Sequence, residues 1–354
     1  MNEKMKILEM LSQGKITTDE AMLLLEQIGE QKGNGPRPES GRGEKERRDF
    51  DFSLGGLGET IGNAVRDGIG ALEDIDVTLD LSDIFIPGHK GNYMYTSPAI
   101  GQNITALRLL GKNDKIEITG HDGKDIRIFC EYKAKRHDVT VGVSEDGGVY
   151  ELLYDYNAMR SMKIYCHVPR NLIEELNAET KNAKIILKDV KAGNIALTTK
   201  NDKIELARVA AAELNLQTSN SKIDIESVTA QNARLVTSNA KIATENIDIK
   251  HMYVKTSNSG IKLENIFGID SAERTIEAHT SNGGISMFVP HSVAVSLQAS
   301  TSNSSVTCHL PNMLTGESKK NYVNCKSQNY DTAANRAKIN VSTSNGAIKI
   351  REQQ

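Results

Sequence analysis

The sequence has few of the residues that build a compact globular core. Its 354 residues include no tryptophan, and aromatic residues make up only 5% of the chain. Hydrophobic residues of all kinds reach 38%. A large compact core is usually richer in apolar side chains, whereas a thin stack of β-strands needs only small aliphatic residues inside. The composition therefore favours an extended repeat architecture.

Cysteine is also scarce, and no close pair of cysteines indicates a zinc site or a disulfide framework. Two cysteines begin related motifs, Cys166-His167-Val168-Pro169 and Cys308-His309-Leu310-Pro311. Alternation along a strand places neighbouring side chains on opposite faces, so one Cys-His pair cannot form a metal site. We expect no metal and no cofactor, and buried thiols at Cys130 and Cys166 in a reducing compartment.

The chain lacks a strong charge of one sign and a long apolar run. A net charge of −3 gives no basic footprint for nucleic acid. No stretch approaches the roughly 18 consecutive apolar residues of a transmembrane helix, and no apolar signal segment follows Met1. These absences predict a cytoplasmic protein that a membrane surface can recruit. A cell-surface location reached by a non-classical route is the alternative.

The dominant positive feature is a repeated Thr-x-Asn-x-Lys-Ile motif, clearest at 218–223 and 237–242. Five of its asparagines, from Asn182 to Asn258, follow one another at steps of 19 residues, and later copies are spaced less regularly. A fixed period near 20 residues indicates a solenoid. The asparagines expected at the corners are Asn182, Asn201, Asn220, Asn239, Asn258, Asn282, Asn303 and Asn345.

Apolar residues alternate with polar ones before each asparagine, which predicts a strand with one buried face. After the asparagine the apolar positions shift by an odd number of residues, as from Leu216 to Ile223, which indicates a corner. The asparagines share the buried parity, so we expect them to point inward or to sit in the corner, as a buried corner ladder in which each amide bonds to the next. The predicted fold is mainly β, a single-stack parallel β-solenoid with coils of about 19–21 residues.

A stripe of lysines accompanies the corners. Lysine stands two residues after the asparagine in four consecutive coils, and the parity of Ile223 and Ile225 makes this position outward. Glu205 and Asp224 follow on the same face. One interpretation is a self-neutralising surface, and the other is a site for an anionic envelope component or a membrane surface. The stripe consists of Lys184, Lys203, Lys222 and Lys241.

Residues 1–30 predict a small α-helical hairpin that acts as an interaction module. Apolar residues recur at helical spacing, and Thr17 to Glu20 forms a capping box before the second helix. Thirty residues bury too little surface to be stable alone. We therefore expect this hairpin to bind a protein partner or a second copy of itself. Its expected interaction face is Leu8, Leu11, Leu24, Leu25 and Ile28.

Three further segments follow the hairpin. Residues 31–49 combine glycine, proline and mixed charge, which is typical of a disordered linker. Residues 50–75 have the apolar spacing of an amphipathic helix weakened by glycine, which either binds a membrane or partner surface or caps the solenoid. Residues 76–354 form the predicted β-solenoid, with a hairpin extension at 119–160 that covers its open end.

At Leu11 to Leu25 the chain reads Leu-x-x-Gly-Lys-Ile-Thr-x-x-Glu-Ala-x-x-Leu-Leu. Together with the Thr-x-Asn-x-Lys-Ile coils, this hairpin resembles the YvlB/LiaX-like bacterial proteins, whose β-solenoid of unassigned function carries the name adhesin. The resemblance implies a Gram-positive bacterium and a link to cell-envelope stress. Some relatives regulate the response to membrane-active antimicrobial peptides.

Three classes of function remain after these observations. A β-helix enzyme that acts on polysaccharide needs carboxylates converging on a cleft, but Glu205, Asp224 and Glu245 are spread singly along the coils. We therefore expect a non-enzymatic scaffold or regulatory protein of the envelope stress response, which binds a protein or an envelope component. A surface adhesin is the alternative, and the polysaccharide-acting enzyme is the least favoured.

Overall fold

The computed structural model describes residues 89–101, 104–266 and 273–353. The chain divides into two units, Met1–Pro87 and Gly88–Gln354, and the described residues all belong to the second. The hairpin 1–30 with its interaction face, the linker 31–49 and the helix 50–75 lie outside the described residues and stay predictions. Among the described residues, no helix is long and apolar enough to cross a membrane.

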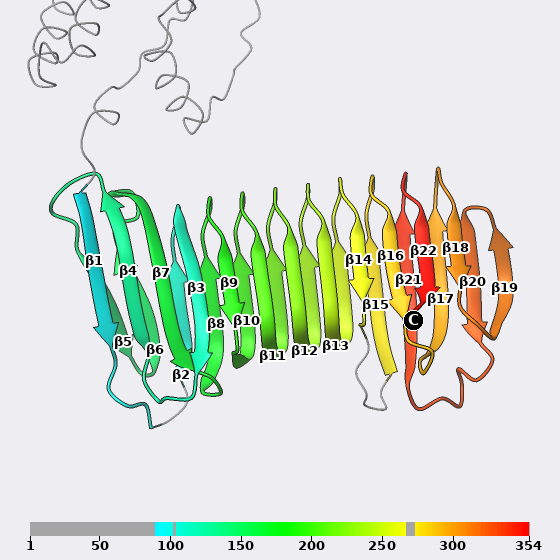
Figure 1. Cartoon of the computed structure of the whole chain (residues 1–354), viewed down its shortest axis with the longest axis horizontal. Helices are drawn as coiled ribbons and strands as arrows, with labels where there is room; N and C mark the ends of the chain where they lie inside the picture. Colours follow the sequence, from blue (N-terminus) through cyan, green and yellow to red (C-terminus); the bar gives the residue numbers. More distant parts are fainter. Residues whose placement is uncertain (1–88, 102–103, 267–272, 354) are drawn as a thin grey trace, which may run out of the picture. The chain divides into compact units, whose positions relative to one another are not determined.

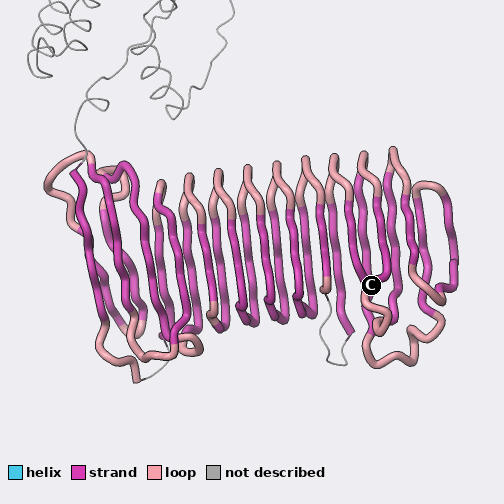
Figure 2. The backbone as a smooth tube through the Cα atoms, in the orientation of Figure 1, coloured by secondary structure: helices cyan, strands magenta, loops and turns pink. Residues whose placement is uncertain are grey.

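The described residues form β-strands joined by turns and loops (Figures 1 and 2). The strands are β1 (His89–Thr96), β2 (Ile104–Leu110), β3 (Asp114–His121), β4 (Arg127–Ala134), β5 (Val141–Asp146), β6 (Val149–Tyr154), β7 (Met159–Pro169), β8 (Ile173–Glu179), β9 (Ile185–Lys188), β10 (Lys191–Thr198), β11 (Ile204–Gln217), β12 (Ile223–Val236), β13 (Ile242–Lys255), β14 (Ile261–Glu264), β15 (Glu273–His279), β16 (Ile285–Val289), β17 (Ala294–Thr301), β18 (Val306–His309), β19 (Met313–Lys319), β20 (Tyr322–Ser327), β21 (Arg336–Thr343) and β22 (Ile348–Glu352).

The central coils repeat with a step of 19 residues. β11 pairs with β12 in parallel from Ile204↔Ile223 to Gln217↔Val236, and the pairing is interrupted at Arg208 and Ala212. β12 pairs with β13 in the same way. Each coil therefore consists of three strand segments in succession, separated by the interruptions at the positions of Arg208 and Ala212, and it ends at the Thr-x-Asn corner. The predicted mainly β, solenoid-like fold is confirmed.

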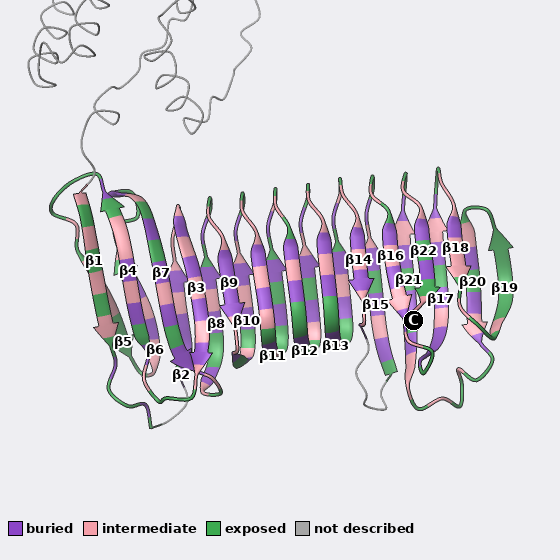
Figure 3. Cartoon of the chain, viewed as in Figure 1, coloured by how far each residue is buried: buried purple, intermediate pink, exposed green. Residues whose placement is uncertain are grey.

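The core is a narrow column between the two sides of the coils. Successive isoleucines such as Ile204, Ile223 and Ile242 stack at the same position and are fully buried. Along each strand buried residues alternate with exposed ones, which Figure 3 shows as alternating purple and green bands. Small aliphatic side chains fill this column, so the scarcity of aromatic residues suits the fold.

The asparagine ladder is present, but at the exposed tip of the corner. Asn220 donates its side-chain amide to Asn201 Oδ1 at 2.7 Å, and Asn239 donates to Asn220 at 2.6 Å. The ladder asparagines are exposed, so the expectation of burial is wrong. The inward position is taken by threonine: Thr237 is 2% exposed and donates to the carbonyl of Ser221 at 3.0 Å. A threonine hydroxyl at this buried position has one proton to donate and needs one acceptor for it. A buried asparagine side chain would need partners for two N–H donors and for its carbonyl oxygen.

A second corner, which no recurring residue marks in the sequence, uses left-handed backbone. Arg208 has φ of 55°, and the residues 19 positions apart on either side of it also have positive φ. Arg208 donates two hydrogen bonds of 2.7 Å to the carboxylate of Asp189 in the preceding coil. The series is Asp189, Arg208, Ser227, Asn246 and Asn265, with φ between 47° and 58°.

The order of coils in space departs from chain order at both ends. β21 lies between β15 and β17, and β22 lies between β16 and β18. At the other end, β2 lies between β6 and β8, and β3 lies between β7 and β9. β4, β5 and β6 fall within the segment 119–160, where β4 pairs antiparallel with β1 and β5 with β6.

Candidate functional site

The predicted lysines lie on one long side of the coils, which we call the charged face. It comprises the outward side chains of β3, β9, β14 and the first four residues of β11, β12 and β13, together with the lysine that directly precedes each of β9, β11, β12 and β13. Consecutive lysine positions are linked by backbone hydrogen bonds from the next residue, as from Ile185 N to Lys203 O at 3.1 Å. Gly260 takes the position after Lys241, so the lysine stripe ends there. Lys184, Lys203, Lys222 and Lys241 thus follow one another in adjacent coils.

Two of the four lysines share one carboxylate. Lys184 forms an ion pair with Glu205 at 2.6 Å, and Lys203 also pairs with Glu205. Burial pushes the pKa of Glu205 upward, but hydrogen bonds from the two lysines outweigh it, so this pKa lies below its usual value. The hydrogen bond to Glu205 in turn raises the pKa of Lys203. Glu205 and Lys203 therefore both stay charged at neutral pH.

The next two coils carry charges that are not paired within the described part of the chain. Lys222 and Lys241 form no ion pair with a described residue, and neither do Asp224, Glu226 or Glu245. Glu226 and Glu245 are direct neighbours in the parallel register. Lysine and glutamate lie four residues apart on each strand, about 13 Å, which is too far for a direct bond. This part of the charged face offers charges of both signs to a partner.

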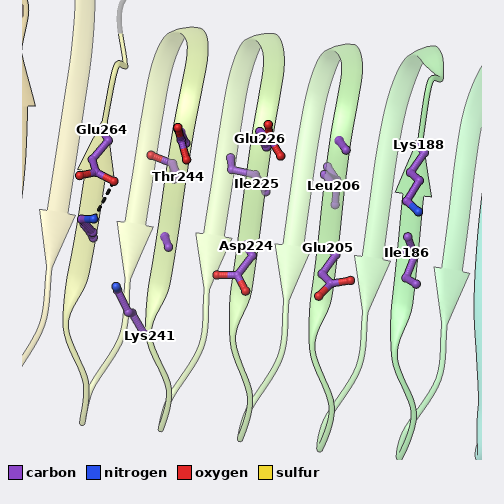
Figure 4. A pocket seen from close by; sticks show the side chains of 14 residues that line it. Ile186, Lys188, Glu205, Leu206, Asp224, Ile225, Glu226, Lys241, Thr244 and Glu264 are labelled. Atoms are coloured by element: carbon purple, nitrogen blue, oxygen red, sulfur yellow. Dashed lines mark ion pairs between the residues drawn. The ribbon is translucent and has the colours of Figure 1, made fainter.

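A shallow depression of about 460 Å³ crosses the charged face (Figure 4). Figure 4 shows Asp224 and Lys241 on its lower part and Glu226 and Glu264 on its upper part, with Lys262 paired to Glu264 at 2.7 Å. In the adjacent coils that run from β3 to β14, the three outward rows hold seven lysines and six carboxylates, so this part of the face is close to neutral overall. The lysines are 115, 184, 188, 203, 222, 241 and 262, and the carboxylates are Glu117, Glu205, Asp224, Glu226, Glu245 and Glu264.

One buried side chain beneath this depression is unpaired. Thr244 lies at an inward position between Ile225 and Leu263 in the neighbouring coils. It is 2% exposed, and its hydroxyl has no hydrogen-bond partner. Such a group costs free energy because it has lost water without replacing it. The alternation of buried and exposed residues along the strand predicts an apolar residue at position 244, and the two neighbouring coils have Ile225 and Leu263 there.

The described residues contain no group of three or more His, Cys, Asp or Glu side chains placed to hold a metal ion. In the Cys-His pairs, Cys166 is buried and His167 is exposed, as strand alternation predicts. Burial, with a smaller contribution from Asp114, raises the pKa of the Cys130 thiol to about 12. Burial likewise raises the pKa of Cys166. Both thiols are therefore protonated at neutral pH and are poor nucleophiles.

Residues 73–351 match the Toastrack family, DUF4097. The chain belongs to this family. Its N-terminal residues 2–33 match the SHOCT-like domain. A comparison with curated proteins gave no match. The Toastrack match covers the described residues up to Arg351, including the charged face.

Several solved structures resemble this Toastrack chain over 75% of its length, all at low identity. A proposed cell adhesion protein of Clostridium sporogenes is 12% identical, with all of its own chain covered and a TM-score of 0.25. A proposed lipid-binding protein of Parabacteroides distasonis is 13% identical, with 98% covered and a TM-score of 0.41. A proposed adhesin of Bacteroides fragilis is 12% identical, with 98% covered and a TM-score of 0.35. At these sequence identities and TM-scores, the solved structures do not indicate a ligand for this chain.

Proposed function

We propose that the protein is a non-enzymatic binding scaffold that acts in the bacterial cell-envelope stress response. The observation that carries this proposal is the set of unpaired charges around the depression on the charged face. Lys222 and Lys241 form one row, and Glu226 and Glu245 form a second row in the same two coils. A continuous parallel ladder holds both rows in fixed positions. Fixed charges of both signs favour specific association with a complementary surface.

The near balance of charge bears on the class of partner. A polyanion or an anionic membrane is attracted by an excess of basic groups, and on this face the carboxylates largely offset the lysines. A protein surface can offer both signs at once. We therefore propose a protein as the main partner of the charged face, and only weak, salt-sensitive attraction of an anionic envelope component.

The remaining parts of the proposal concern chemistry and location. The carboxylates of the charged face are spread over several strands, with at most two on one strand, and among the described residues no general acid and base converge on a cleft, which supports a binding role rather than catalysis. We propose that residues 1–30 supply a second contact, to a protein partner or to a second copy. The protein would act in the cytoplasm and join the membrane when the envelope is damaged.

The test is fractionation of cells grown with and without a membrane-active peptide. We expect the protein to move from the soluble to the membrane fraction on treatment, and to be protected from protease added to intact cells. A constant distribution would contradict the stress-linked role. Cleavage of the protein on intact cells would instead favour the surface adhesin, which is the second candidate.

Co-sedimentation with vesicles separates the two classes of partner. We expect weak binding to anionic vesicles at low salt and none at physiological salt, because screening shortens the range of surface charges. The K222Q/K241Q variant should lose the low-salt binding. The K184Q/K203Q variant removes the same number of lysines, but these are already paired to Glu205, so it should lose less. Strong binding at physiological salt would show that a membrane, not a protein, is the main partner.

A further inference from the structure

Two of the four cysteines lie together at the end of the stack that β19 and β20 close. Cys308 on β18 is the parallel neighbour of Ile350 on β22, and Cys325 on β20 is opposite Leu297 on β17. Ile350 and Leu297 belong to the buried core. Among the described strands, β18 pairs only with β22, and β19 pairs only with β20. Both cysteines therefore lie over the end of the core column.

The two thiols are in direct contact. Cys325 donates a hydrogen bond to the sulfur of Cys308. Cys325 is 4% exposed and belongs to the core, whereas Cys308 is half-buried and packs against the core. A small solute can therefore reach the sulfur of Cys308, and the second sulfur lies directly behind it.

The hydrogen bond makes the two thiols chemically different. It lowers the pKa of Cys308 against the effect of burial, and a backbone hydrogen bond from Leu310 acts in the same direction. The same contact, together with burial, raises the pKa of Cys325. The thiolate is the nucleophilic form of cysteine, so Cys308 is the thiol of this pair that reacts first.

The other two cysteines form a comparison pair without this asymmetry. Cys130 and Cys166 lie on the adjacent antiparallel strands β4 and β7, and they are offset by two residues because Cys166 pairs with Ile128. Both are fully buried, and burial raises the pKa of both thiols. Neither is accessible or nucleophilic at neutral pH. The exposure and the lowered pKa of Cys308 therefore distinguish the pair at the end of the stack.

We propose that Cys308 and Cys325 form an oxidation site that hydrogen peroxide converts into a disulfide. The thiolate of Cys308 attacks one peroxide oxygen, the O–O bond breaks, and Cys308 becomes a sulfenic acid. The hydroxide that leaves takes up the proton that Cys308 had released. The sulfur of Cys325 then attacks the sulfur of Cys308, the S–O bond breaks, and the hydroxyl leaves with the proton of Cys325 as a second water. The two thiols lose two electrons, and the peroxide is reduced to two waters.

The disulfide would fasten the hairpin of β19 and β20 to the last coil. It would join β18, which follows the corner at Asn303, to β20, which pairs with the strand before that corner. A disulfide needs its sulfurs about 2 Å apart, so the hairpin must move towards β18. No described strand pairs with the outer edge of β19 to oppose this movement. The site is separate from the charged face, and the proposal holds whatever that face binds.

The test is treatment of the reduced, folded full chain with hydrogen peroxide at neutral pH, followed by alkylation of the remaining thiols and peptide mapping. We expect the chain to lose the mass of two hydrogens and to give a peptide that links Cys308 to Cys325, with Cys130 and Cys166 alkylated. Cys308 should be oxidised at least about tenfold faster than Cys130 or Cys166, because the rate follows thiolate fraction and access. Dithiothreitol should restore all four thiols.

Two variants separate the roles of the two thiols. Cys325→Ser keeps the thiol that reacts first, so peroxide should leave Cys308 as a sulfenic acid that dimedone traps. Cys308→Ser removes that thiol, so Cys325 should stay reduced under the same treatment. In the unchanged protein, oxidation should slow hydrogen exchange of the β20 amides several-fold and leave the amides of β11 to β13 unchanged.

Each of several outcomes would overturn the proposal. They are a folded chain that peroxide leaves unlinked, equal oxidation of all four cysteines, a link that forms only in urea, and oxidation of Cys325 in Cys308→Ser at the unchanged rate. Unchanged exchange of the β20 amides would show that the disulfide does not fasten the hairpin. Melting curves check that both variants are folded, and the peptide map of the unchanged protein decides the question without them.

Discussion

Asn345 donates its side-chain amide to Asn282 at 2.7 Å, although 63 residues separate them in the chain. Asn303 in turn donates to Asn345 at 2.7 Å. The coil made by β21 and β22 therefore lies inside the stack, between coils that precede it in the sequence. The stack between β15 and β17 is incomplete until the last residues of the chain are in place.

We expect removal of residues 336–354 to unfold the end of the stack beyond β16. Without β21 and β22, the strands β17 and β18 lose their parallel partners, while β8 to β13 keep theirs. Limited proteolysis should cleave between residues 290 and 330 and leave the coils from 173 to 266 intact. A truncated chain with the same cleavage pattern as the full chain would contradict the inserted position of this coil.

The ladder prediction concerns Asn239, which donates to Asn220 and accepts from Asn258. Asn239→Leu removes two exposed hydrogen bonds, so we expect a loss of about 1–2 kcal/mol in the free energy of unfolding. Asn157 is an exposed turn residue outside the repeat, and Asn157→Leu should change stability by less than about 0.5 kcal/mol. Chemical denaturation measures both, and equal losses would show that the ladder contributes nothing.

Thr244 and Thr237 give a matched pair of substitutions at buried threonines. Thr244 has no hydrogen-bond partner, so Thr244→Val should stabilise the protein by about 1 kcal/mol. Thr237 donates to Ser221 O, so Thr237→Val leaves a carbonyl unpaired and should destabilise by about 1–3 kcal/mol. Denaturation midpoints of the two variants should move in opposite directions. A loss of stability in both would mean that the hydroxyl of Thr244 is bonded.

The second corner predicts a dependence of stability on acid. The hydrogen bond from Arg208 holds the pKa of Asp189 below its usual value, against the effect of burial. A carboxyl with a lowered folded-state pKa stabilises the protein above its unfolded-state pKa of about 4, and this stability is lost as the pH falls through the folded-state value. Asp189→Asn should therefore be less stable than the unchanged protein at pH 7 and closer to it at pH 3. A constant difference across this range would contradict the pairing.

The coil period, the strands and the outward lysines could be predicted because identical residues recur at a fixed step and side chains alternate along strands. The burial of threonine rather than asparagine could not, since the two share one parity and only the geometry of the tip separates them. The left-handed corner was missed because its residues differ from coil to coil, from Asp189 to Arg208 to Ser227.

The order of coils at the ends could not be predicted for a related reason. The motif at Asn345 repeats the corner pattern of the other coils, so the sequence does not specify which two coils it stacks between. The pairing within the charged face was only partly predictable: the sequence places Glu205 near the lysines, but only the structure shows that it takes both Lys184 and Lys203. Lys222 and Lys241 form no ion pair with a described residue.

Cross-linking in living cells tests the binding role of the charged face most directly. A photoreactive group at position 243, between the lysine and glutamate rows, should form a defined adduct with a protein partner. The charge-reversed variant K222E/K241E/E226K/E245K should lose this adduct and keep its melting temperature, while K184Q/K203Q should retain the adduct. The same adducts in all three proteins, or none in any of them, would contradict the account.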